Sequence, residues 1–489
     1  LEQPLFTCGR CELRDPTNLK MLAIFAVTFV VALIGAVVYF YSDGSRKRKT
    51  SIPGLDPTDA KNGNLAEMGA EGTVHEFLMK LHKTYGSIAS FWYGKTFTVS
   101  IASPELFKEH MGVFDRPCEL FEIFLPLYGK SSVEFTNKAE GKKRRIMYDP
   151  AFAHTSLGNY YGTFNELARE LVQKLSAIPK DEHVSLMHHC HIVVIKALTR
   201  TSFGNYFDSE EIVNTFRQAY NDCWYDMERS LTEGLHVKGS DREKKFNEAL
   251  EVMYGIVRNV MKERKTNPTA GHQRFIDVLL ENELPEDQIL SDCISYMVGG
   301  FHTSGNLLLW ILYFLASNQD CQEKLHQEIK EVLGDGEVDK SNVKDMKYLR
   351  QVINEGLRVS VLAPYTARFQ DNDSKLGGHV IPGGTPVWHA LGVALKDEDL
   401  WPEPEKFDPE RFSVANFTPR HKMAFQVFGF AGKRVCPGKF FAYAKMAVFV
   451  ALLCRDLKFN LVEGQNIEQF YGMVTSPKSE IWFHLEKRG

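Results

Sequence analysis

The 489-residue sequence has no surplus of charge of one sign and no disulfide framework. Lys and Arg number 58 and Asp and Glu 62, so the formal net charge of -4 gives no reason to expect nucleic acid as a partner. The nine cysteines are scattered, and their odd number fits a reducing compartment. Internal repeats, low-complexity stretches and long linkers are absent after residue 55, so residues 56–489 are predicted to form one large domain.

One long apolar run stands near the beginning of the sequence. Residues 21–41 carry no charge, and about 20 apolar residues in a helix suffice to cross a bilayer. A cleaved signal peptide and a buried core helix are the alternatives. A signal peptide has a shorter apolar stretch and a small-residue cleavage site, which residues 39–41 do not offer. We therefore predict a retained, single-pass membrane anchor over 21–41.

The segments on either side of this run are short. Residues 42–55 are predicted to be a basic stop-transfer segment followed by a hinge, because the Pro-Gly pair at 53–54 stops a continuing helix. The four basic residues at 46–49 favour a cytosolic location for the rest of the chain. Met21 looks like a natural start, so residues 1–20 are an extension of doubtful nativeness, and we assign them no function.

Hydrophobic periodicity predicts a mainly α domain with small sheets at its margins. The pattern is overwhelmingly helical from about 160 to 365. Helices are predicted over 74–84, roughly 285–317, 319–333, 345–359 and 440–454. Strands are predicted over 88–93 and 96–102, with Gly94 at the turn between them, near 376–389, and after 456.

The chemistry begins with a cysteine in a glycine-rich loop. Residues 428–438 read FGFAGKRVCPG and place Cys436 just before the predicted helix at 440–454. Amide groups at a helix start lower the pKa of a nearby thiol, and Gly432 and Gly438 let the backbone turn around it. Arg434 adds positive charge that could hold an anionic group. A buried structural cysteine in a turn is the alternative that these residues alone leave open.

This loop resembles the haem-binding signature of the cytochrome P-450 superfamily, whose cysteine thiolate holds the iron. Three further blocks resemble that family in the same order along the chain. They are Gly299 to Ser304, like its oxygen-activating segment, Glu355-Gly-Leu-Arg358, like its Glu-x-x-Arg pair, and Phe407 to Phe412, like the segment that supplies a second arginine, Arg411. Four blocks in order, behind an apolar anchor and a proline hinge, are specific, and the resemblance covers about residues 21–489.

Within the superfamily the chain most resembles the family-twenty cytochromes of animals, an orphan branch. The stretches IPGLDPT at 52–58, HEFLMKLHKTYGSIASFWYG at 75–94 and VEGQNIE at 462–468 carry this resemblance. Residues 121–130 lie where relatives line the distal pocket, and they resemble the matching stretch of sterol demethylases. A sterol-like or lipid-like substrate is therefore a hypothesis, although any aromatic-rich loop there would look similar.

The superfamily resemblance implies the cytochrome P-450 fold and a haem-thiolate monooxygenase. Such an enzyme inserts one oxygen atom from O2 into an apolar substrate, with electrons from NADPH through a flavoprotein reductase, at the endoplasmic reticulum membrane. The implied cofactor is haem b (iron protoporphyrin IX), with Cys436 as the metal ligand. Two other functions stay open, a haem-thiolate isomerase or dehydratase and a haem-binding membrane protein without turnover.

The resemblance also implies catalytic roles in the oxygen-activating segment. Thr303 is expected to turn its hydroxyl to the carbonyl one turn back, opening the helix locally, and to donate to oxygen. Gly299 and Gly300 would leave space for oxygen against the helix. Most relatives have an acid before this threonine, where this chain has His302. Histidine can relay protons at neutral pH, and simple packing of the ring is the alternative.

The two carboxylates of haem favour arginine or lysine partners. By resemblance Arg434, Arg368 and Arg145 are the candidates. The family commonly has tryptophan where this chain has Gly141, so Arg144 and Lys142 remain substitutes for Arg145.

The usual phenylalanine seven residues before the cysteine is replaced by Gly429. Phe428 and Phe430 flank this glycine, and either could pack beside the thiolate.

Two further sets of charged residues complete the expectations. Glu355, Arg358 and Arg411 are implied to form a buried structural network that fixes the core around the ligand loop. A basic surface is predicted from Lys142, Lys143, Arg144, Lys433 and Lys439. An acidic reductase would be steered to such a surface, and a merely solvated basic face is the alternative.

Overall fold

The computed structural model describes Thr28 and residues 30–34, 50–266 and 273–488. The predicted extension 1–20, most of the predicted anchor 21–41 and all but the last residues of the segment 42–55 lie outside this part. Thr28 and residues 30–34 are helical.

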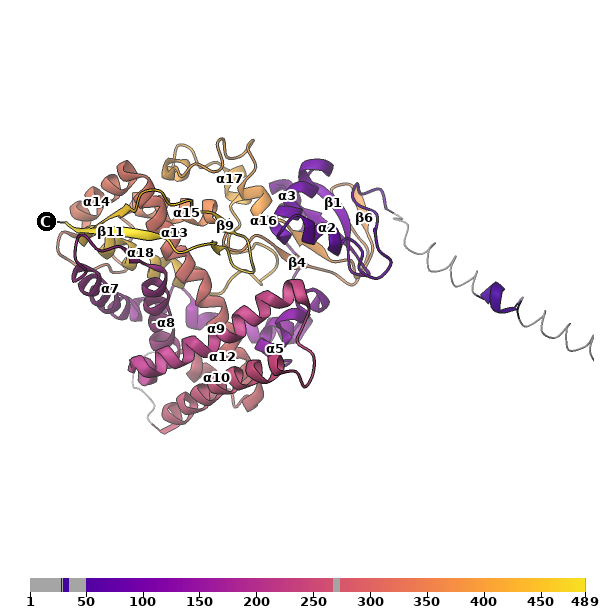
Figure 1. Ribbon diagram of the computed structural model, residues 1–489, viewed down its shortest axis with the longest axis horizontal. Helices are drawn as coiled ribbons and strands as arrows, with labels where there is room; N and C mark the ends of the chain where they lie inside the picture. Colours follow the sequence, from indigo (N-terminus) through magenta and orange to yellow (C-terminus); the bar gives the residue numbers. More distant parts are fainter. Residues whose placement is uncertain (1–27, 29, 35–49, 267–272, 489) are drawn as a thin grey trace, which may run out of the picture.

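The chain folds into a large helical part and a smaller part built around a four-stranded sheet (Figure 1). The α-helices are α2 (Leu65–Ala70), α3 (Val74–Tyr85), α4 (Pro104–Glu109), α5 (Leu125–Tyr128), α6 (Lys138–Tyr148), α7 (Tyr161–Ser176), α8 (Met187–Phe203), α9 (Glu210–Glu233), α10 (Asp241–Thr266), α11 (Phe275–Glu281), α12 (Glu286–Gly300), α13 (His302–Ser317), α14 (Gln319–Leu333), α15 (Lys347–Ser360), α16 (Leu391–Leu395), α17 (Pro419–Ala424) and α18 (Lys439–Asp456). The strands are β1 (Ile88–Tyr93), β2 (Thr96–Ile101), β3 (Val184–Ser185), β4 (Thr366–Arg368), β5 (Ser374–Leu376), β6 (His379–Ile381), β7 (Val387–His389), β8 (Leu457–Leu461), β9 (Gln469–Phe470), β10 (Ser476–Pro477) and β11 (Trp482–Lys487). Short 3-10 helices are η1 (Cys118–Phe124), η2 (Val133–Phe135), η3 (Asp149–Phe152), η4 (Leu157–Asn159), η5 (Asn205–Asp208) and η6 (Pro409–Phe412).

The four-stranded sheet joins segments that lie far apart in the sequence. Its strand order is β1-β2-β7-β4, with β1 antiparallel to β2 and β2 parallel to β7. Gly94 has a φ of 59° in the tight turn between β1 and β2, a conformation that glycine adopts without strain. The predicted hairpin is confirmed. The extended region predicted near 376–389 is confirmed as well, although it divides into three short strands.

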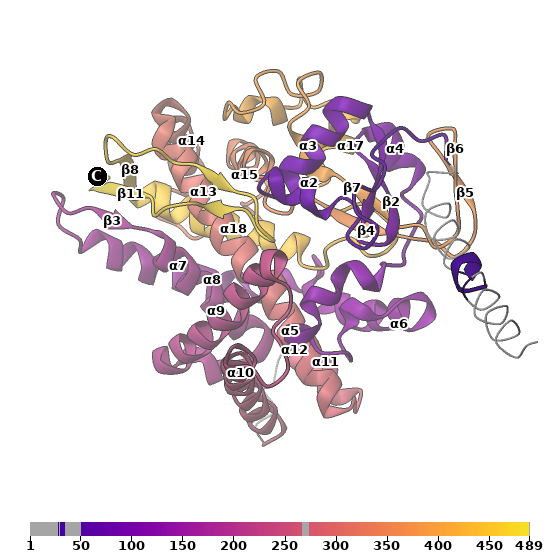
Figure 2. The same cartoon turned by 45° about the vertical axis from the view of Figure 1, so that its right-hand side comes forward.

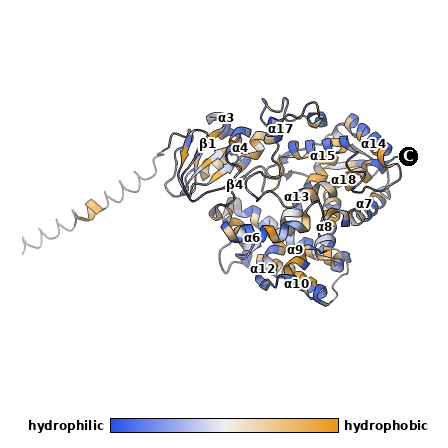
Figure 3. Ribbon diagram, turned by 180° about the vertical axis from the view of Figure 1, so that it is seen from behind, coloured by the Kyte–Doolittle hydropathy of each residue, from blue (hydrophilic) through white to orange (hydrophobic). Residues whose placement is uncertain are grey.

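The helices follow the predicted mainly helical pattern, with their apolar faces turned inward. Figure 3 shows hydrophilic and hydrophobic residues alternating along outer helices such as α10 and α14, as expected when one face packs on the core. Figures 1 and 2 show α12 and α13 running through the middle of the helical part. Together they form a helix long and apolar enough to cross a bilayer, but 78% of its most apolar window is buried, so it is a core helix.

The predicted helix at 285–317 is present but broken at one residue. Phe301 separates α12 from α13, with φ of -87° and ψ of -78°. The Thr303 hydroxyl donates to the carbonyl oxygen of Gly299, across the break, at 2.6 Å. This is the local opening that the sequence predicts for Thr303, and it places a hydroxyl where the helix is distorted.

A buried charge network ties α15 to the chain segment that precedes the cysteine loop. Glu355 accepts from Arg358 Nε at 2.7 Å and from its Nη2 at 2.8 Å, and both side chains are fully buried. Arg358 also donates to the carbonyl oxygen of Pro404 at 2.8 Å, and the Asp408 N–H donates to Glu355 at 2.9 Å. Arg411 Nε lies 3.3 Å from the same carboxylate. The contacts expected for this set are therefore all present.

Replacing Arg358 with alanine should lower the free energy of unfolding, because Glu355 would remain buried without its main cation. Stranding one partner of a buried pair costs about 3–5 kcal/mol. The free energy of unfolding in urea measures the loss. Lys478→Ala serves as the control, since its pair with Glu468 is exposed and should leave stability almost unchanged. Equal losses in the two variants would contradict a structural role for this network.

Candidate functional site

A cavity of about 340 Å³ lies where the cysteine loop meets the broken helix. Its walls come from residues 427–438, from α18, from α12 and α13, and from the segment 362–368 that leads into β4. The predicted site residues that line it are Cys436, Gly438, Phe428, Arg434, Arg368, Arg145, Thr303, Gly299 and Gly300. The structure thus brings together residues that the sequence spreads over almost 300 positions.

Cys436 lies on a tight loop at the start of α18. Its backbone N–H donates to the Phe428 carbonyl oxygen at 2.9 Å. Gly432, with a φ of 58°, allows the loop to pass Phe114, because a Cβ there would lie 2.8 Å from the Phe114 Cα. Burial raises the pKa of the Cys436 thiol, while the Gly438 N–H and Arg145 act in the opposite direction. The helix start therefore lowers this pKa as expected, through the Gly438 N–H, but burial outweighs that effect and the net direction is upward.

The two aromatic candidates beside the cysteine face different ways. Phe428 lines the cavity and packs against Tyr443, with ring centroids 5.4 Å apart. Phe430 lies outside the cavity and stacks on Phe107 and His389, at 4.7 and 4.5 Å. Gly429 has a φ of 75°, so the chain turns between the two rings. Of the two rings that the sequence left open, Phe428 is therefore the one that lines the cavity with Cys436, whereas Phe430 packs outside it.

Arginine side chains crowd one side of the cavity. Burial and mutual repulsion lower the pKa of Arg368 to about 9 and that of Arg434 to about 10. Arg116, which the sequence reasoning missed, joins them and pairs with Glu134. In the described part of the chain, the Nε atoms of Arg116, Arg368 and Arg434 have no hydrogen-bond partner. Buried cations with free donors require an anionic group, and the two carboxylates of haem fit that requirement.

Of the adjacent arginines on α6, only Arg145 reaches the cavity. Its Nε pairs with Asp149 at 2.7 Å, and its Nη2 donates to the Val435 carbonyl oxygen at 2.6 Å, next to the cysteine. Arg144 pairs instead with Glu140 at 2.8 Å and does not line the cavity. The geometry therefore favours Arg145 over the substitutes considered from the sequence.

The side chain of Arg434 leaves no room for a side chain at position 141, where the sequence has glycine. A Cβ on Gly141 would lie 2.6 Å from the Thr136 carbonyl oxygen and 3.1 Å from Arg434 Nη2. That same guanidinium donates to the carbonyl oxygens of Val133 and Thr136. Arg434 therefore occupies the space beside α6, which explains why a large residue is absent at position 141.

The glycines of the oxygen-activating segment differ in their surroundings. A Cβ on Gly299 would meet nothing within 4 Å, so open space faces the Gly299 carbonyl that Thr303 engages. At Gly300 the Leu198 side chain would lie 2.9 Å from such a Cβ. Only Gly299 therefore leaves free room against the helix, whereas Gly300 is needed for close packing with α8.

His302 faces away from the cavity. It is buried, its Nε2 lies 3.2 Å from the Asn221 side-chain oxygen, and its ring packs on Trp224 and His191 at 4.7 and 5.3 Å. Burial holds the pKa of His302 well below its ordinary value. Successive residues of a helix point about 100° apart, so His302 turns toward α8 and α9 while Thr303 turns to the cavity. The structure thus places His302 in the packed position that was the alternative to a relay.

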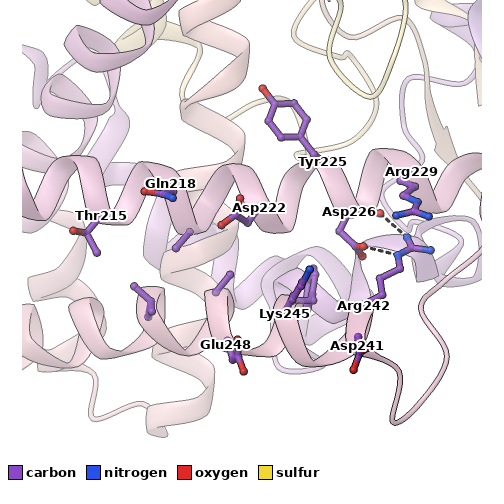
Figure 4. Close-up of a pocket in the computed structure, with 14 residues that line it drawn as sticks. Thr215, Gln218, Asp222, Tyr225, Asp226, Arg229, Asp241, Arg242, Lys245 and Glu248 are labelled. Carbon is purple, nitrogen blue, oxygen red and sulfur yellow. Dashed lines mark hydrogen bonds and ion pairs between the residues drawn. The ribbon is translucent and has the colours of Figure 1, made fainter.

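A larger hollow of about 880 Å³ lies between α9 and α10 (Figure 4). Its walls carry charged side chains of both signs, and Asp226 pairs with Arg242 across it at 2.5 Å. Cys436, Thr303 and the arginine cluster all lie elsewhere. We therefore assign the chemistry to the smaller cavity.

Replacing Gly141 with alanine should destabilise the protein, because the added methyl group meets backbone at Thr136 and the Arg434 guanidinium. Overpacking of this kind costs about 1–3 kcal/mol. Gly162→Ala in α7 is the matched control, since a Cβ there meets nothing within 4 Å. Thermal unfolding of both variants tests the idea, and a Gly141 variant as stable as the control would contradict it.

Comparison with known proteins agrees with this site. The family model described as Cytochrome P450 matches residues 54–483. Cytochrome P450 20A1 of Bos taurus is 34% identical over 466 residues, which cover 95% of this chain and 99% of that protein, and the Mus musculus protein of the same name is 35% identical with the same coverage. Sugiol synthase of Salvia miltiorrhiza is 26% identical over 89% of this chain and 93% of its own length. The chain therefore belongs to the cytochrome P450 family of haem-thiolate monooxygenases.

Proposed function

We propose that this monooxygenase takes electrons from NADPH through a flavoprotein reductase and inserts one oxygen atom into an apolar, sterol-like or lipid-like substrate. The observation that carries the proposal is that Cys436 and Thr303 line one cavity. A thiol that can hold iron and a hydroxyl that can handle protons are thereby brought to the same enclosed space.

Each group at the site has a definite task. When bound, haem supplies the reduction and cleavage of O2. Cys436 Sγ would hold its iron, and the arginines of the cavity wall, Arg116, Arg145, Arg368 and Arg434, would hold its carboxylates. Thr303 keeps a proton at Oγ1, and the bond to the Gly299 carbonyl orients that hydroxyl. By rotating, the hydroxyl can donate into the cavity instead.

The walls of the cavity favour an apolar substrate. Five leucine side chains line it, and they are Leu198, Leu307, Leu357, Leu362 and Leu391. An apolar lining excludes water and binds apolar surface. Phe124 and Tyr128 of the sterol-demethylase-like stretch stack at 5.4 Å but do not line the cavity. The substrate class therefore rests on the leucine walls.

The proposed reductase site is a hollow of about 680 Å³ on the face behind the cysteine loop. Lys142 and Lys433 stand at its edge, and Arg145 borders both this hollow and the cavity. Ile146 in its lining is 71% exposed, which is unusual for a large apolar side chain. Basic groups around an apolar centre suit an acidic partner, which would approach close to Cys436.

A membrane anchor over 21–41, at the endoplasmic reticulum, is part of the proposal. Val30, Val31, Leu33 and Ile34 are helical, and each is more than half exposed. Four large, exposed apolar side chains within five consecutive helical residues are suited to lipid.

A haem-thiolate isomerase or dehydratase is the second candidate. The position of His302 outside the cavity favours it, because such enzymes need no proton relay from solvent. The two candidates differ in their need for a reductase.

We expect the holoenzyme, reconstituted with reductase and NADPH, to form products with one added oxygen atom from a lipid extract. Untargeted mass spectrometry detects them, and Cys436→Ser, which removes the thiolate ligand, is the inactive control. Products that carry added oxygen only with reductase support the monooxygenase. Products that form equally well without reductase, or no product at all, would count against it.

Thr303→Ala should raise the molar ratio of hydrogen peroxide formed to NADPH consumed several-fold, because proton delivery into the cavity is impaired. The ratio should approach one. General acid catalysis by one positioned group contributes about 10²–10⁴-fold, so the effect should be large. Thr303→Ser keeps the hydroxyl and serves as the control. An alanine variant with the peroxide yield of the wild type would remove Thr303 from proton delivery.

A further inference from the structure

Lys445 is an anomaly in the core of the protein. It lies in the middle of α18, its side chain is fully buried, and among the described residues its Nζ has no hydrogen-bond or ion-pair partner. Burying an amine without a partner is unfavourable, and lysines are rarely found in that state. A group kept at such a cost calls for a functional explanation.

The amine lies in the wall of the catalytic cavity. Helices α13 and α18 pack side by side (Figures 1 and 2). From α18 the cavity is lined by Phe441, Ala442 and Lys445, and from α13 by Thr303, Ser304 and Leu307. Each set has the spacing i, i+1, i+4, which is one face of a helix. Lys445 and Thr303 therefore face the same space from opposite helices.

Within the described part of the chain, no charged group pairs with the amine of Lys445. Its Nζ lies 5.1 Å from the centre of the Phe441 ring, and burial alone lowers the pKa of Lys445 to about 7. Several elements pack against α18, and their titratable groups have partners other than Lys445. These groups are His302, His326, Glu355, Arg358, Glu166, Arg169 and Asp149. Lys445 can therefore hold a proton and release it close to neutral pH.

We propose that Lys445 is an internal proton donor that recharges the Thr303 hydroxyl during oxygen reduction. The inference rests on the proposed function. An N–H bond of the ammonium breaks and its proton passes to Thr303 Oγ1, directly or through a water molecule. Thr303 passes its own proton to the oxygen being reduced, and the neutral amine takes a new proton from solvent water. Lys445 thereby fills the role that the sequence assigned to His302.

The first test measures the protonation state and needs no turnover. An unfolded lysine has a pKa of about 10.4, so between pH 7 and 10 the unfolded chain binds one more proton than the folded one. Stability of the wild type should therefore rise with pH in this window relative to Lys445→Met, which lacks the amine. The thermal midpoint of the variant should exceed that of the wild type at pH 7, and the difference should shrink toward pH 10. A difference independent of pH would overturn the inference.

The second test measures proton delivery in the holoenzyme with reductase and NADPH. Lys445→Met should raise the peroxide formed per NADPH several-fold. In the wild type this ratio should rise as pH increases through about 7, while in the variant it should stay high and flat. Lys445→Gln also removes the titratable amine but keeps a polar side chain, so it should raise the ratio in the same way. The carbon monoxide spectrum of the reduced protein checks that thiolate ligation persists in both variants.

Lys396→Met is the matched control, because Lys396 is buried outside the cavity and pairs with Glu405. It should leave the peroxide ratio unchanged. Reductase-dependent NADPH consumption by the wild type tests the proposed function separately. If that consumption occurs and the Lys445 variants keep the wild-type ratio and pH profile, the role of Lys445 is refuted while the monooxygenase stands.

Discussion

Four guanidinium groups and one amine surround a single cavity, and among the residues that the structure describes only Arg145 and Arg116 of these five have a carboxylate partner. Burial of cations without counter-charges is unfavourable, because an isolated charge loses its hydration. Arg368 and Arg434 therefore depend on an anion that the protein does not itself supply. Haem has two carboxylates, so its binding would offset the unfavourable free energy of burying these unpaired cations. Cofactor retention and stability of the fold should consequently be coupled.

The Glu355 network has the opposite character. Its carboxylate is matched by two arginines and a backbone N–H, and Arg358 is satisfied by carbonyl oxygens of the segment before the cysteine loop. In this network the carboxylate of Glu355 and the guanidinium of Arg358 are both hydrogen-bonded, which fixes their geometry. The protein thus uses one paired charge network to hold the loop, and one cluster of cations with few counter-charges to receive the cofactor.

Much of this arrangement could be predicted from the sequence, where a residue's environment follows from periodicity or from a motif. The broken core helix, the hairpin at Gly94 and the placement of Cys436 beside Thr303 are of this kind. The sequence left two alternatives open for Phe430 and for His302, because each is the neighbour of a residue that lines the cavity, and only the backbone geometry shows that each side chain turns elsewhere. Arg116 lies in an irregular loop, where neither hydrophobic periodicity nor a motif indicates the direction of a side chain, so the sequence did not point to it. Lys445 was not singled out from the sequence, because a lysine within an apolar helix can also extend its amine to solvent, and only the structure shows that it is buried.

The identity of the buried proton source has a physical consequence of its own. A carboxylic acid that gives up a proton leaves an anion in an apolar wall, and that anion must be stabilised until it is reprotonated. An ammonium group that gives up a proton leaves a neutral amine, which an apolar wall tolerates. The unfavourable state of Lys445 is therefore the one before donation, and its burial among Phe441 and other apolar groups assists release. A position lined by apolar side chains thus suits a lysine donor better than an acid.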